Sequence, residues 1–373
     1  MTRREAIIGL NMMTSLGPVR VRNLITALGS PEAVFTAGEE ELCRAKGIGV
    51  EVARSILDQR VTVDTAAEEA RAHKCGAHII TQDDAEYPAA LKQIYDPPLA
   101  LYVRGTLVAE DRHAMAVVGT RHATHYGQSV ADTLAYQLAR TGFTVVSGLA
   151  RGIDTAAHRA ALKGGGRTLA VLGSALDKLY PEENAELADR IAEHGAVISE
   201  YTMGREPDRT TFPYRNRIVS GLSMGLIVVE AGVKSGAVIT ATEALEQGRT
   251  VFAVPGRVDQ PSARGTHMLI KQGARLCEGI DDILQEFEML IPPSQAERVK
   301  SMPKRPDVPL TQDEQVVVKA LWKGGLDVDA LARAAGLKSS HISALLLGLE
   351  MKRVVRILPG RVVELREDLR PDG

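Results

Sequence analysis

The feature that most constrains the fold is a regular alternation of short apolar runs and longer helical stretches across the middle of the chain. The runs have strand length, and the segments between them place apolar residues at helical spacing. Most runs are almost continuously hydrophobic, as expected of parallel strands buried on both faces. The runs are Ala114–Val118, Thr144–Ser147, Thr168–Leu172, Ala196–Ser199, Leu226–Glu230 and Val251–Val254. The pattern predicts an α/β fold with a doubly wound parallel sheet.

Two smaller regions flank this sheet. The first hundred residues show helical spacing without strands, and Ser15–Ile25 and Lys46–Ile56 each place a glycine turn before an amphipathic helix. These turns are typical of helix-hairpin-helix motifs, and ordinary helix–helix turns explain them equally well. Residues 291–310 hold five prolines and no apolar period, which indicates a linker. Three helical segments and a hairpin after it predict a winged helix, which could contact DNA or protein. We expect a helical domain at 1–80, the α/β domain at 81–290 and the winged helix at 311–373.

The composition narrows the class of protein. The 373 residues are 45% hydrophobic and 25% charged, as in an ordinary globular protein. Three cysteines outside any CxxC pair indicate a reducing compartment and argue against structural zinc, and no apolar run is long enough to span a membrane. We therefore expect a cytoplasmic protein without a metal. With 45 Lys and Arg against 47 Asp and Glu and 4% aromatics, the chain lacks the broad basic surface of many nucleic-acid binders.

The turns that follow the predicted strands carry the candidate binding residues. Gly119-Thr120-Arg121 follows the first strand, the glycine-rich loop Gly148–Gly152 with Arg151 follows the second, and Lys234-Ser235-Gly236 precedes a later helix expected to begin near Thr240. Because the carboxyl ends of parallel strands meet at one edge of a sheet, these loops should form a single rim of N–H groups and arginines. Such a rim suits several consecutive phosphates.

The segment 205–217 is the main local basic cluster, since its four arginines face only two carboxylates. Phe212 lies among these arginines, where it could stack on a base or belong to the core. Arg215 and Arg217 are two residues apart, so a helix would point them in different directions. We expect one to meet a ligand and the other to pair with an internal carboxylate such as Glu200 or Glu230.

Two pairs of polar residues allow a catalytic or metal-binding interpretation. Asp154 and His158 could form an acid–base dyad, or Asp154 could cap a helix and bond His158 to stiffen the loop. We favour the capped helix, because no nucleophile lies nearby. His122 and His125 could bind a metal, but without a third ligand they are more simply explained as polar loop residues.

A set of motifs in order resembles the DNA-processing protein A family, also called DprA or Smf. The motifs are VVGTR, SGLARGIDTAAH, VLGSALDKLYPEEN, ISEY, FPYRNRIVSGLS, VVEAGVKSGAVITA and FAVPG, and the resemblance spans roughly residues 85–280. It implies an extended Rossmann-like core, a SAM-like helical domain before it and a winged helix after it.

The resemblance also implies a function without catalysis or a cofactor. The family binds single-stranded DNA, helps to load RecA recombinase during natural transformation, and forms homodimers. Carried onto this sequence, the implied DNA contacts are Gly119, Thr120, Arg121, Gly148, Arg151, Gly152, Arg209, Phe212, Arg215, Asn216, Arg217, Lys234, Ser235 and Gly236. The implied dimer interface is Met268, Leu269, Ile270 and Leu276, for which a place in the core is an equal alternative. After Tyr180-Pro181, family members often carry basic residues, whereas this chain has Glu182-Glu183. The helix that follows should therefore contact phosphate poorly.

Two other functions remain open. A Rossmann-like nucleotide-processing enzyme of the phosphoribohydrolase type would need a double-glycine phosphate loop, whereas this chain reads AGVKSGAVITATEA at that position. A winged-helix regulator with an α/β sensor domain would bind duplex DNA through residues 305–373 alone.

Overall fold

The computed structural model describes residues 1–287, 310–322, 324–351, 354–358 and 362–365. Contacts divide the chain into one unit at Met1–Val299 and a second at Lys300–Gly373. The proline-rich linker predicted at 291–310 lies almost wholly outside the described residues.

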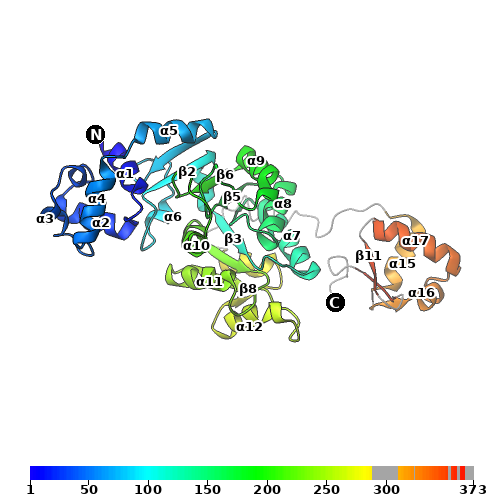
Figure 1. The fold of residues 1–373 in the computed structure, drawn as a ribbon. Coiled ribbons are helices and arrows are strands. Elements are labelled where there is room, and N and C mark those ends of the chain that lie inside the picture. The colour runs from blue at the N-terminus through cyan, green and yellow to red at the C-terminus, as the bar shows by residue number, and fades with distance from the viewer. Residues whose placement is uncertain (288–309, 323, 352–353, 359–361, 366–373) are drawn as a thin grey trace. The chain divides into compact units, whose positions relative to one another are not determined.

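A nine-stranded sheet forms the centre of the first unit (Figure 1). Its strand order is β1-β2-β6-β5-β4-β3-β7-β8-β9. The strands are β1 (Ala77–Thr81), β2 (Ala100–Gly105), β3 (Ala114–Val118), β4 (Thr144–Ser147), β5 (Thr168–Val171), β6 (Ala196–Ser199), β7 (Gly225–Val228), β8 (Thr250–Ala253) and β9 (Arg275–Leu276). The strands from β6 to β9 are parallel to one another, whereas β2 runs antiparallel to β6 and β1 antiparallel to β2.

The order of the strands reverses at β3. The chain proceeds from β3 through β4 and β5 to β6 on one side, and then returns to place β7, β8 and β9 on the other side. The loops that leave β3 and β7 therefore diverge at the carboxyl edge of the sheet. In open α/β sheets, ligands bind outside this point of reversal.

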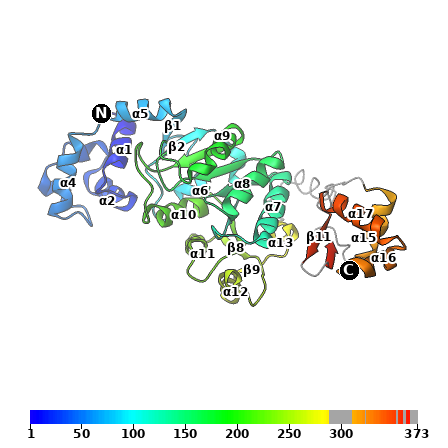
Figure 2. The same ribbon diagram turned by 45° about the vertical axis from the view of Figure 1, so that its right-hand side comes forward.

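Helices cover both faces of the sheet (Figure 2). Met115 and Val117 of β3 pack with residues of α7 and α8 on one face, while Ala116 and Val118 belong to the core of the opposite face with residues of α10 and α11. The helices are α7 (His125–Arg140), α8 (Ile153–Lys163), α9 (Ala185–His194), α10 (Thr211–Gly221), α11 (Gly236–Glu246), α12 (Arg264–Lys271) and α13 (Ile280–Phe287). Every residue of β3 is buried, which explains its unbroken apolar sequence.

The six predicted strands and the doubly wound α/β class are confirmed, but the expectation of a strand-free first hundred residues is wrong. β1 and the start of β2 lie there and extend the sheet. Both are antiparallel additions joined through a short helix, α6 (Ala89–Lys92), so the βα alternation does not reveal them. The helix expected from Thr240 begins earlier, at Gly236.

The N-terminal helices form a small core beside this end of the sheet. They are α1 (Arg3–Met12), α2 (Pro18–Leu28), α3 (Glu39–Leu42), α4 (Val50–Arg60) and α5 (Thr65–Lys74). Gly17 and Gly49 stand at the N-caps of α2 and α4, so both predicted glycine turns do precede helices. Buried residues of these two helices, including Val21 and Ile56, form a core of their own.

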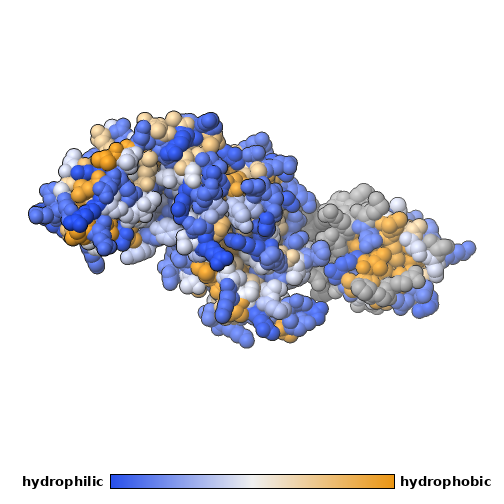
Figure 3. All heavy atoms as spheres, in the orientation of Figure 1, coloured by the Kyte–Doolittle hydropathy of each residue, from blue (hydrophilic) through white to orange (hydrophobic). Residues whose placement is uncertain are grey.

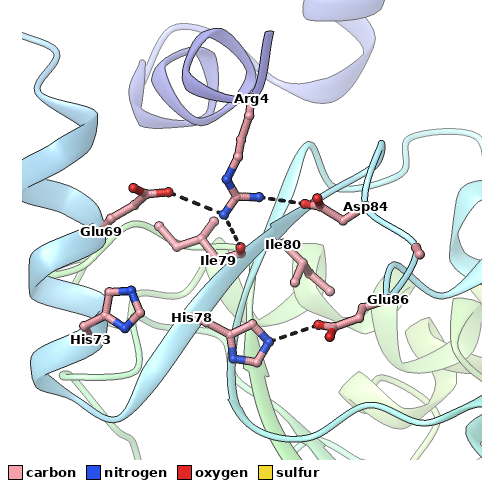
Figure 4. Close-up of a pocket in the computed structure, with 9 residues that line it drawn as sticks. Arg4, Glu69, His73, His78, Ile79, Ile80, Asp84 and Glu86 are labelled. Carbon is pink, nitrogen blue, oxygen red and sulfur yellow. Dashed lines mark hydrogen bonds and ion pairs between the residues drawn. The ribbon is translucent and has the colours of Figure 1, made fainter. Parts of the chain in front are cut away.

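Arg4 of α1 ties this helical region to the free edge of β1 (Figure 4). Its guanidinium donates to the Ile79 carbonyl at 2.6 Å and pairs with Asp84 at 2.7 Å, and the Asp84 carboxylate accepts the Thr81 N–H at 2.6 Å. Polar groups of an exposed strand edge are a template for unwanted pairing. Arg4 and Asp84 satisfy two of them.

The second unit is a winged helix. Its helices are α15 (Gln312–Ala320), α16 (Val328–Ala335) and α17 (Ser339–Met351), and its sheet has the order β10-β12-β11, with β10 (Leu326–Asp327), β11 (Val355–Leu358) and β12 (Val362–Leu365). This confirms the three helices and the hairpin. The sequence of α17 holds no Lys or Arg, and its His341 pairs with Asp313 at 2.9 Å.

Apolar side chains are exposed on this unit, as Figure 3 shows for one face. Leu347 of α17 is 61% exposed, and Val316, Trp322 and Ile357 are also exposed. An apolar helix without lysine or arginine is a poor match for the DNA backbone, so this surface favours protein contact over DNA contact.

Candidate nucleic-acid interface

The loops that leave β3, β4, β5 and β6 meet at the carboxyl edge of the sheet, as predicted. They enclose a cavity of about 130 Å³, which we call the rim pocket. Its lining combines residues from the loops after β3, β4 and β5 and from α10: Arg121, His122, Gly148, Ala150, Arg151, Tyr180, Pro181, Phe212 and Arg215. Five of these nine, namely Arg121, Gly148, Arg151, Phe212 and Arg215, are residues predicted from the sequence.

Phe212 forms the aromatic wall of the rim pocket. The Arg121 guanidinium carbon lies 5.0 Å from the centre of the Phe212 ring, and the Tyr180 ring lies 5.7 Å from it in a tilted arrangement. A Cβ on Gly173 would stand 2.7 Å from the Phe212 ring, so the glycine after β5 lets the ring settle there. Phe212 is half-buried and lines the pocket, which suits stacking better than a place in the core.

Arg121 is the available cation of the rim pocket. It is exposed, and among the described residues it forms no ion pair with a carboxylate. Its guanidinium lies over an aromatic ring, so its side chain is positioned while its charge is left uncompensated. A guanidinium in this state can accept a phosphate without first breaking a salt bridge.

Arg215 holds two loops together from inside the pocket. It is 5% exposed, and one guanidinium nitrogen donates to the Gly148 carbonyl at 2.7 Å and also to the Val171 carbonyl. Burial lowers the pKa of Arg215, and the nearby charge of Asp154 opposes that shift. Arg215 therefore joins the ends of β4 and β5, and it adds positive charge beneath Phe212.

Arg217 is directed into the protein. It is 3% exposed, and it pairs with Glu200 at 2.6 Å and with Asp96 at 3.0 Å. This confirms the expectation that one arginine of α10 pairs with Glu200. It also assigns Arg217 an internal role in place of the strand contact expected for it.

Asp154 and His158 do not form a dyad. α8 begins at Ile153 with Gly152 as its N-cap, so Asp154 lies in the first turn and is not the cap. The Asp154 carboxylate accepts from the N–H groups of Gly148 and Ala150 at 3.1 and 3.3 Å, while His158 bonds Thr168 at 2.7 Å. Burial raises the pKa of Asp154 and lowers that of His158 to about 3. Asp154 fixes the loop after β4 and His158 bonds the start of β5, so both the dyad and the Asp–His bond expected from the sequence are wrong.

The backbone of the rim is less available to anions than the sequence suggested. The N–H groups of Gly148 and Ala150 are taken by Asp154, and the Thr120 N–H donates to the Glu230 carbonyl at 2.7 Å. The glycines serve to pack loops together: a Cβ on Gly119 would lie 2.4 Å from Ile153. Side chains, rather than free N–H groups, therefore carry most of the positive potential of the rim.

Glu230 occupies the helix N-terminus at the point of strand reversal. One carboxylate oxygen accepts from the N–H of Thr124, the N-cap of α7, at 2.9 Å, and the other accepts from the Ser262 hydroxyl. A Cβ on Gly127 would stand 2.2 Å from the Glu230 carboxylate. A nucleotide phosphate in a Rossmann-like fold binds at this kind of helix N-terminus. Here an internal carboxylate fills that position.

Arg151 is at the mouth of the pocket but is already paired. Its guanidinium forms two hydrogen bonds of 2.8 Å with the carboxylate of Glu183, and both side chains are more than half exposed. The acidic residues expected to disfavour phosphate therefore act by neutralising Arg151. A strand that uses Arg151 must displace Glu183.

The remaining predicted DNA contacts are spread along the rim. Arg209 is exposed ahead of α10, and Asn216 is half-buried and accepts from Arg215 at 3.3 Å. Lys234 and Gly236 are exposed at the start of α11, after β7, with Ser235 as the N-cap. These three lie outside the rim pocket. Tyr180 lines the pocket although the sequence did not single it out; its place after the β5 strand was the available signal.

The four predicted interface residues divide into core and surface. Leu269 is 2% exposed and belongs to the core of the sheet, and Ile270 packs against that core. Leu269 is therefore not available to a second chain. Leu276 is 45% exposed on β9, the edge strand, while Met268 is partly exposed on α12.

The described residues contain no group of three His, Cys, Asp or Glu side chains that could hold a metal ion, and His122 and His125 are exposed at the start of α7. Within the same residues, no helix has the length and apolar character needed to cross a membrane. All three cysteines are free.

Comparison with known proteins gives matches along most of the chain. The family model described as DNA recombination-mediator protein A matches residues 78–288, a SAM-like helix-hairpin-helix tandem matches 9–60, and a DprA winged helix domain matches 301–361. The chain is 46% identical to DNA processing protein DprA of Bacillus subtilis, over 57% of this chain and 72% of the relative. It is 40% identical to Protein Smf of Escherichia coli, over 78% of both chains.

Two solved structures are similar in fold and sequence. DNA processing protein A from Streptococcus pneumoniae superposes with a TM-score of 0.66 at 34% identity, covering 77% of this chain and 98% of that one. DNA processing protein A from Helicobacter pylori, reported with its single-stranded DNA binding mode, superposes with a TM-score of 0.52 at 31% identity, covering 57% of this chain and 97% of that one.

Proposed function

The chain belongs to the DNA recombination-mediator protein A family, and from this membership and the rim pocket we propose that it binds single-stranded DNA at the carboxyl edge of its sheet. The observation that carries the proposal is the pairing of an unneutralised guanidinium, Arg121, with a half-buried aromatic ring, Phe212, in the lining of one pocket. Single-strand binders combine these two elements, because the cation follows the backbone and the ring stacks on a base.

We expect the rim pocket to bind a single strand in preference to a duplex. A base can reach Phe212 only when it is unstacked from its neighbours, since the ring lies inside a pocket of about 130 Å³. The net charge of −2 also disfavours a broad duplex contact, which depends on many phosphate contacts at once. Arg121 and Arg209 supply local charge in an otherwise slightly acidic protein.

We further propose that the protein acts by binding alone, without catalysis. Glu230 fills the N-terminus of α7, where a Rossmann-like fold can hold the phosphate of a nucleotide, and the loop before α11 lacks the double glycine of a phosphoribohydrolase-type phosphate loop. A second anion beside this carboxylate would be repelled, so the rim pocket, and not the site of strand reversal, receives the phosphate backbone.

The biological role that follows is that of a recombination mediator. In this proposal the protein protects incoming single strands in the cytoplasm, helps to load RecA recombinase onto them during natural transformation, and works as a homodimer. Of the expected interface, the exposed Leu276 on edge strand β9 and the partly exposed Met268 on α12 remain available for such a dimer.

The test compares two charge reversals on the full-length protein. Arg121→Glu should abolish the binding of a fluorescein-labelled oligothymidylate, measured by anisotropy, because it places a carboxylate against the phosphates. Arg140→Glu is the matched control, since Arg140 is an exposed arginine at the last turn of α7, away from the carboxyl edge. Equal binding by wild type and Arg121→Glu would exclude the rim pocket as the DNA site. Release of free base from nucleoside monophosphates would instead support an enzyme.

A further inference from the structure

The exposed tyrosines of the protein are concentrated near the rim. Of the eight tyrosines, four are substantially exposed: Tyr95 at 75%, Tyr126 at 42%, Tyr180 at 40% and Tyr214 at 39%. Tyr180 lines the rim pocket, and Tyr126 begins α7 beside it. Tyr214 and Tyr95 have no part in the pocket. Aromatic residues make up only 4% of this chain, so large exposed aromatic rings gathered in one region indicate a binding surface.

The sheet topology places Tyr95 at the same edge as the pocket. β2 runs antiparallel to β6, with Tyr102 opposite Ser199, so the beginning of β2 and the end of β6 lie together. The segment that precedes β2, which contains Tyr95, therefore reaches the carboxyl edge of the parallel strands. From β2 to β3 the edge crosses β6, β5 and β4, a distance of about 19 Å at ordinary strand spacing.

Tyr214 and Tyr95 are joined through one buried arginine. The Arg217 guanidinium carbon lies 4.0 Å from the centre of the Tyr214 ring, and the same side chain pairs with Asp96, the neighbour of Tyr95. This contact fixes the loop of Tyr95 against α10. The buried Arg217 therefore acts by holding the Tyr214 ring in place and does not contact a phosphate.

The first helical hairpin completes the arrangement. Arg22 of α2 donates to the Tyr95 carbonyl at 2.8 Å, and its guanidinium carbon lies 5.2 Å from the centre of the Tyr95 ring. A Cβ on Gly17, in the turn before α2, would lie 3.8 Å from the Tyr214 hydroxyl. The hairpin, the Tyr95 loop and α10 thus form one continuous surface, seen as neighbours in Figures 1 and 2.

We propose that Tyr214 and Tyr95, together with Arg22, form a second stacking platform for the single strand that leaves the rim pocket past Phe212. This proposal rests on the proposed function. Both tyrosines are substantially exposed and each has a guanidinium over its ring. At Tyr95 this arginine is on the surface, as Arg121 is at Phe212, whereas at Tyr214 the buried Arg217 holds the ring in place. In this arrangement the helical hairpin contributes the Arg22 guanidinium to the DNA-binding surface. This contribution does not depend on any contact between its glycine turns and DNA.

The neighbouring large cavity does not continue this track. A space of about 470 Å³ lies between α1, α5 and β1, lined by Arg4, His73, His78 and the carboxylates of Glu69, Asp84 and Glu86. Arg4 pairs with two of these carboxylates, and Glu86 pairs with His78 at 3.3 Å (Figure 4). Because this lining holds three carboxylates and a single arginine, its net negative charge would repel a phosphodiester backbone. The strand should therefore turn from Tyr95 toward α2.

The experiment varies the length of the DNA. Anisotropy is measured with labelled oligothymidylates of about 4 and about 16 nucleotides, which bracket ordinary site sizes. Tyr95→Leu, at the more exposed ring, should weaken the long oligonucleotide about fivefold or more and leave the short one unchanged, because loss of one stacked base costs at least that factor. Tyr95→Phe should bind as wild type. Phe212→Leu should weaken both lengths.

A spectroscopic readout detects the stacking itself. Tyr95→Trp in a Trp322→Phe background, which removes the one natural tryptophan, should show fluorescence quenching by the long oligonucleotide only. Unquenched Tyr95→Trp together with full long-strand binding by Tyr95→Leu would overturn the platform. If Phe212→Leu still weakened both lengths in that case, the proposed function would stand. Absence of single-strand binding by the wild type would overturn both.

Discussion

Replacing Phe212 with leucine should separate stacking from charge at the rim pocket. The ring lies 5.0 Å from Arg121 and 5.7 Å from Tyr180, and leucine keeps the apolar volume while removing the stacking face. Loss of one base–aromatic stack weakens the free energy of DNA binding by about 1–3 kcal/mol. Loss of the cation–π contact removes up to about 1 kcal/mol of the interaction that holds the Arg121 side chain in position. A central value near 2 kcal/mol corresponds to an affinity about 30-fold weaker.

The assay is the equilibrium binding of labelled oligothymidylate by anisotropy across a salt series. Phe212→Leu removes no phosphate contact, so its plot of log affinity against log salt should run parallel to that of the wild type. Arg121→Ala should instead lower the slope by about 0.7, the value for one phosphate contact on a single strand.

The control is Tyr136→Leu. Tyr136 is also a half-buried aromatic residue with a cation over its ring, Lys163 at 5.9 Å, but it lies on the middle of α7 away from the rim. It should bind DNA as wild type. Wild-type affinity of Phe212→Leu in a folded protein, or a changed salt slope, would refute a stacking role for this ring.

Three further predictions follow from the contacts of the rim. Glu183→Gln should strengthen single-strand binding severalfold and steepen its salt dependence, because it releases Arg151 from its ion pair; unchanged affinity by anisotropy would mean that Arg151 stays off the DNA. Gly127→Ala should lower the free energy of unfolding by about 1–3 kcal/mol, since the new Cβ would overlap a buried carboxylate, whereas Gly232→Ala, with open space around it, should change stability little in urea titrations. Burial lowers the pKa of His158 to about 3 from 6.5, so the unfolded chain binds a proton that the folded chain excludes. Stability should therefore fall as the pH drops from about 6.5 toward 3, and unfolding midpoints measured across that range should fall less steeply in His158→Gln.

The α/β core could be predicted from the sequence because each parallel strand is buried on both faces and so reads as an unbroken apolar run. The edge strands could not. β1 and β2 are mostly buried, but they are antiparallel additions outside the βα alternation, and β9 is only two residues long and exposed. Their positions depend on contacts with segments distant in the sequence.

The sequence predicted which loops form the rim, but only partly which polar groups in those loops are free to bind a ligand. Parallel topology alone brings Arg121 and Gly148 to one edge, as expected. The hydrogen-bond partner of each polar group could not be predicted. Asp154 accepts from the loop before it, and His158 bonds a strand residue ten positions later. Glu230 caps α7 across 106 residues of sequence. Local spacing carries no information about such contacts.

The central claim is that an unstacked strand, and not a duplex, occupies the carboxyl edge of the sheet. The most direct test is to measure the affinity of the full-length protein for a single strand and for the duplex of the same sequence, side by side across a salt series. We expect the single strand to bind more tightly at every salt concentration and its affinity to fall steeply with added salt. Equal or tighter binding of the duplex, or affinity that does not change with salt, would contradict it.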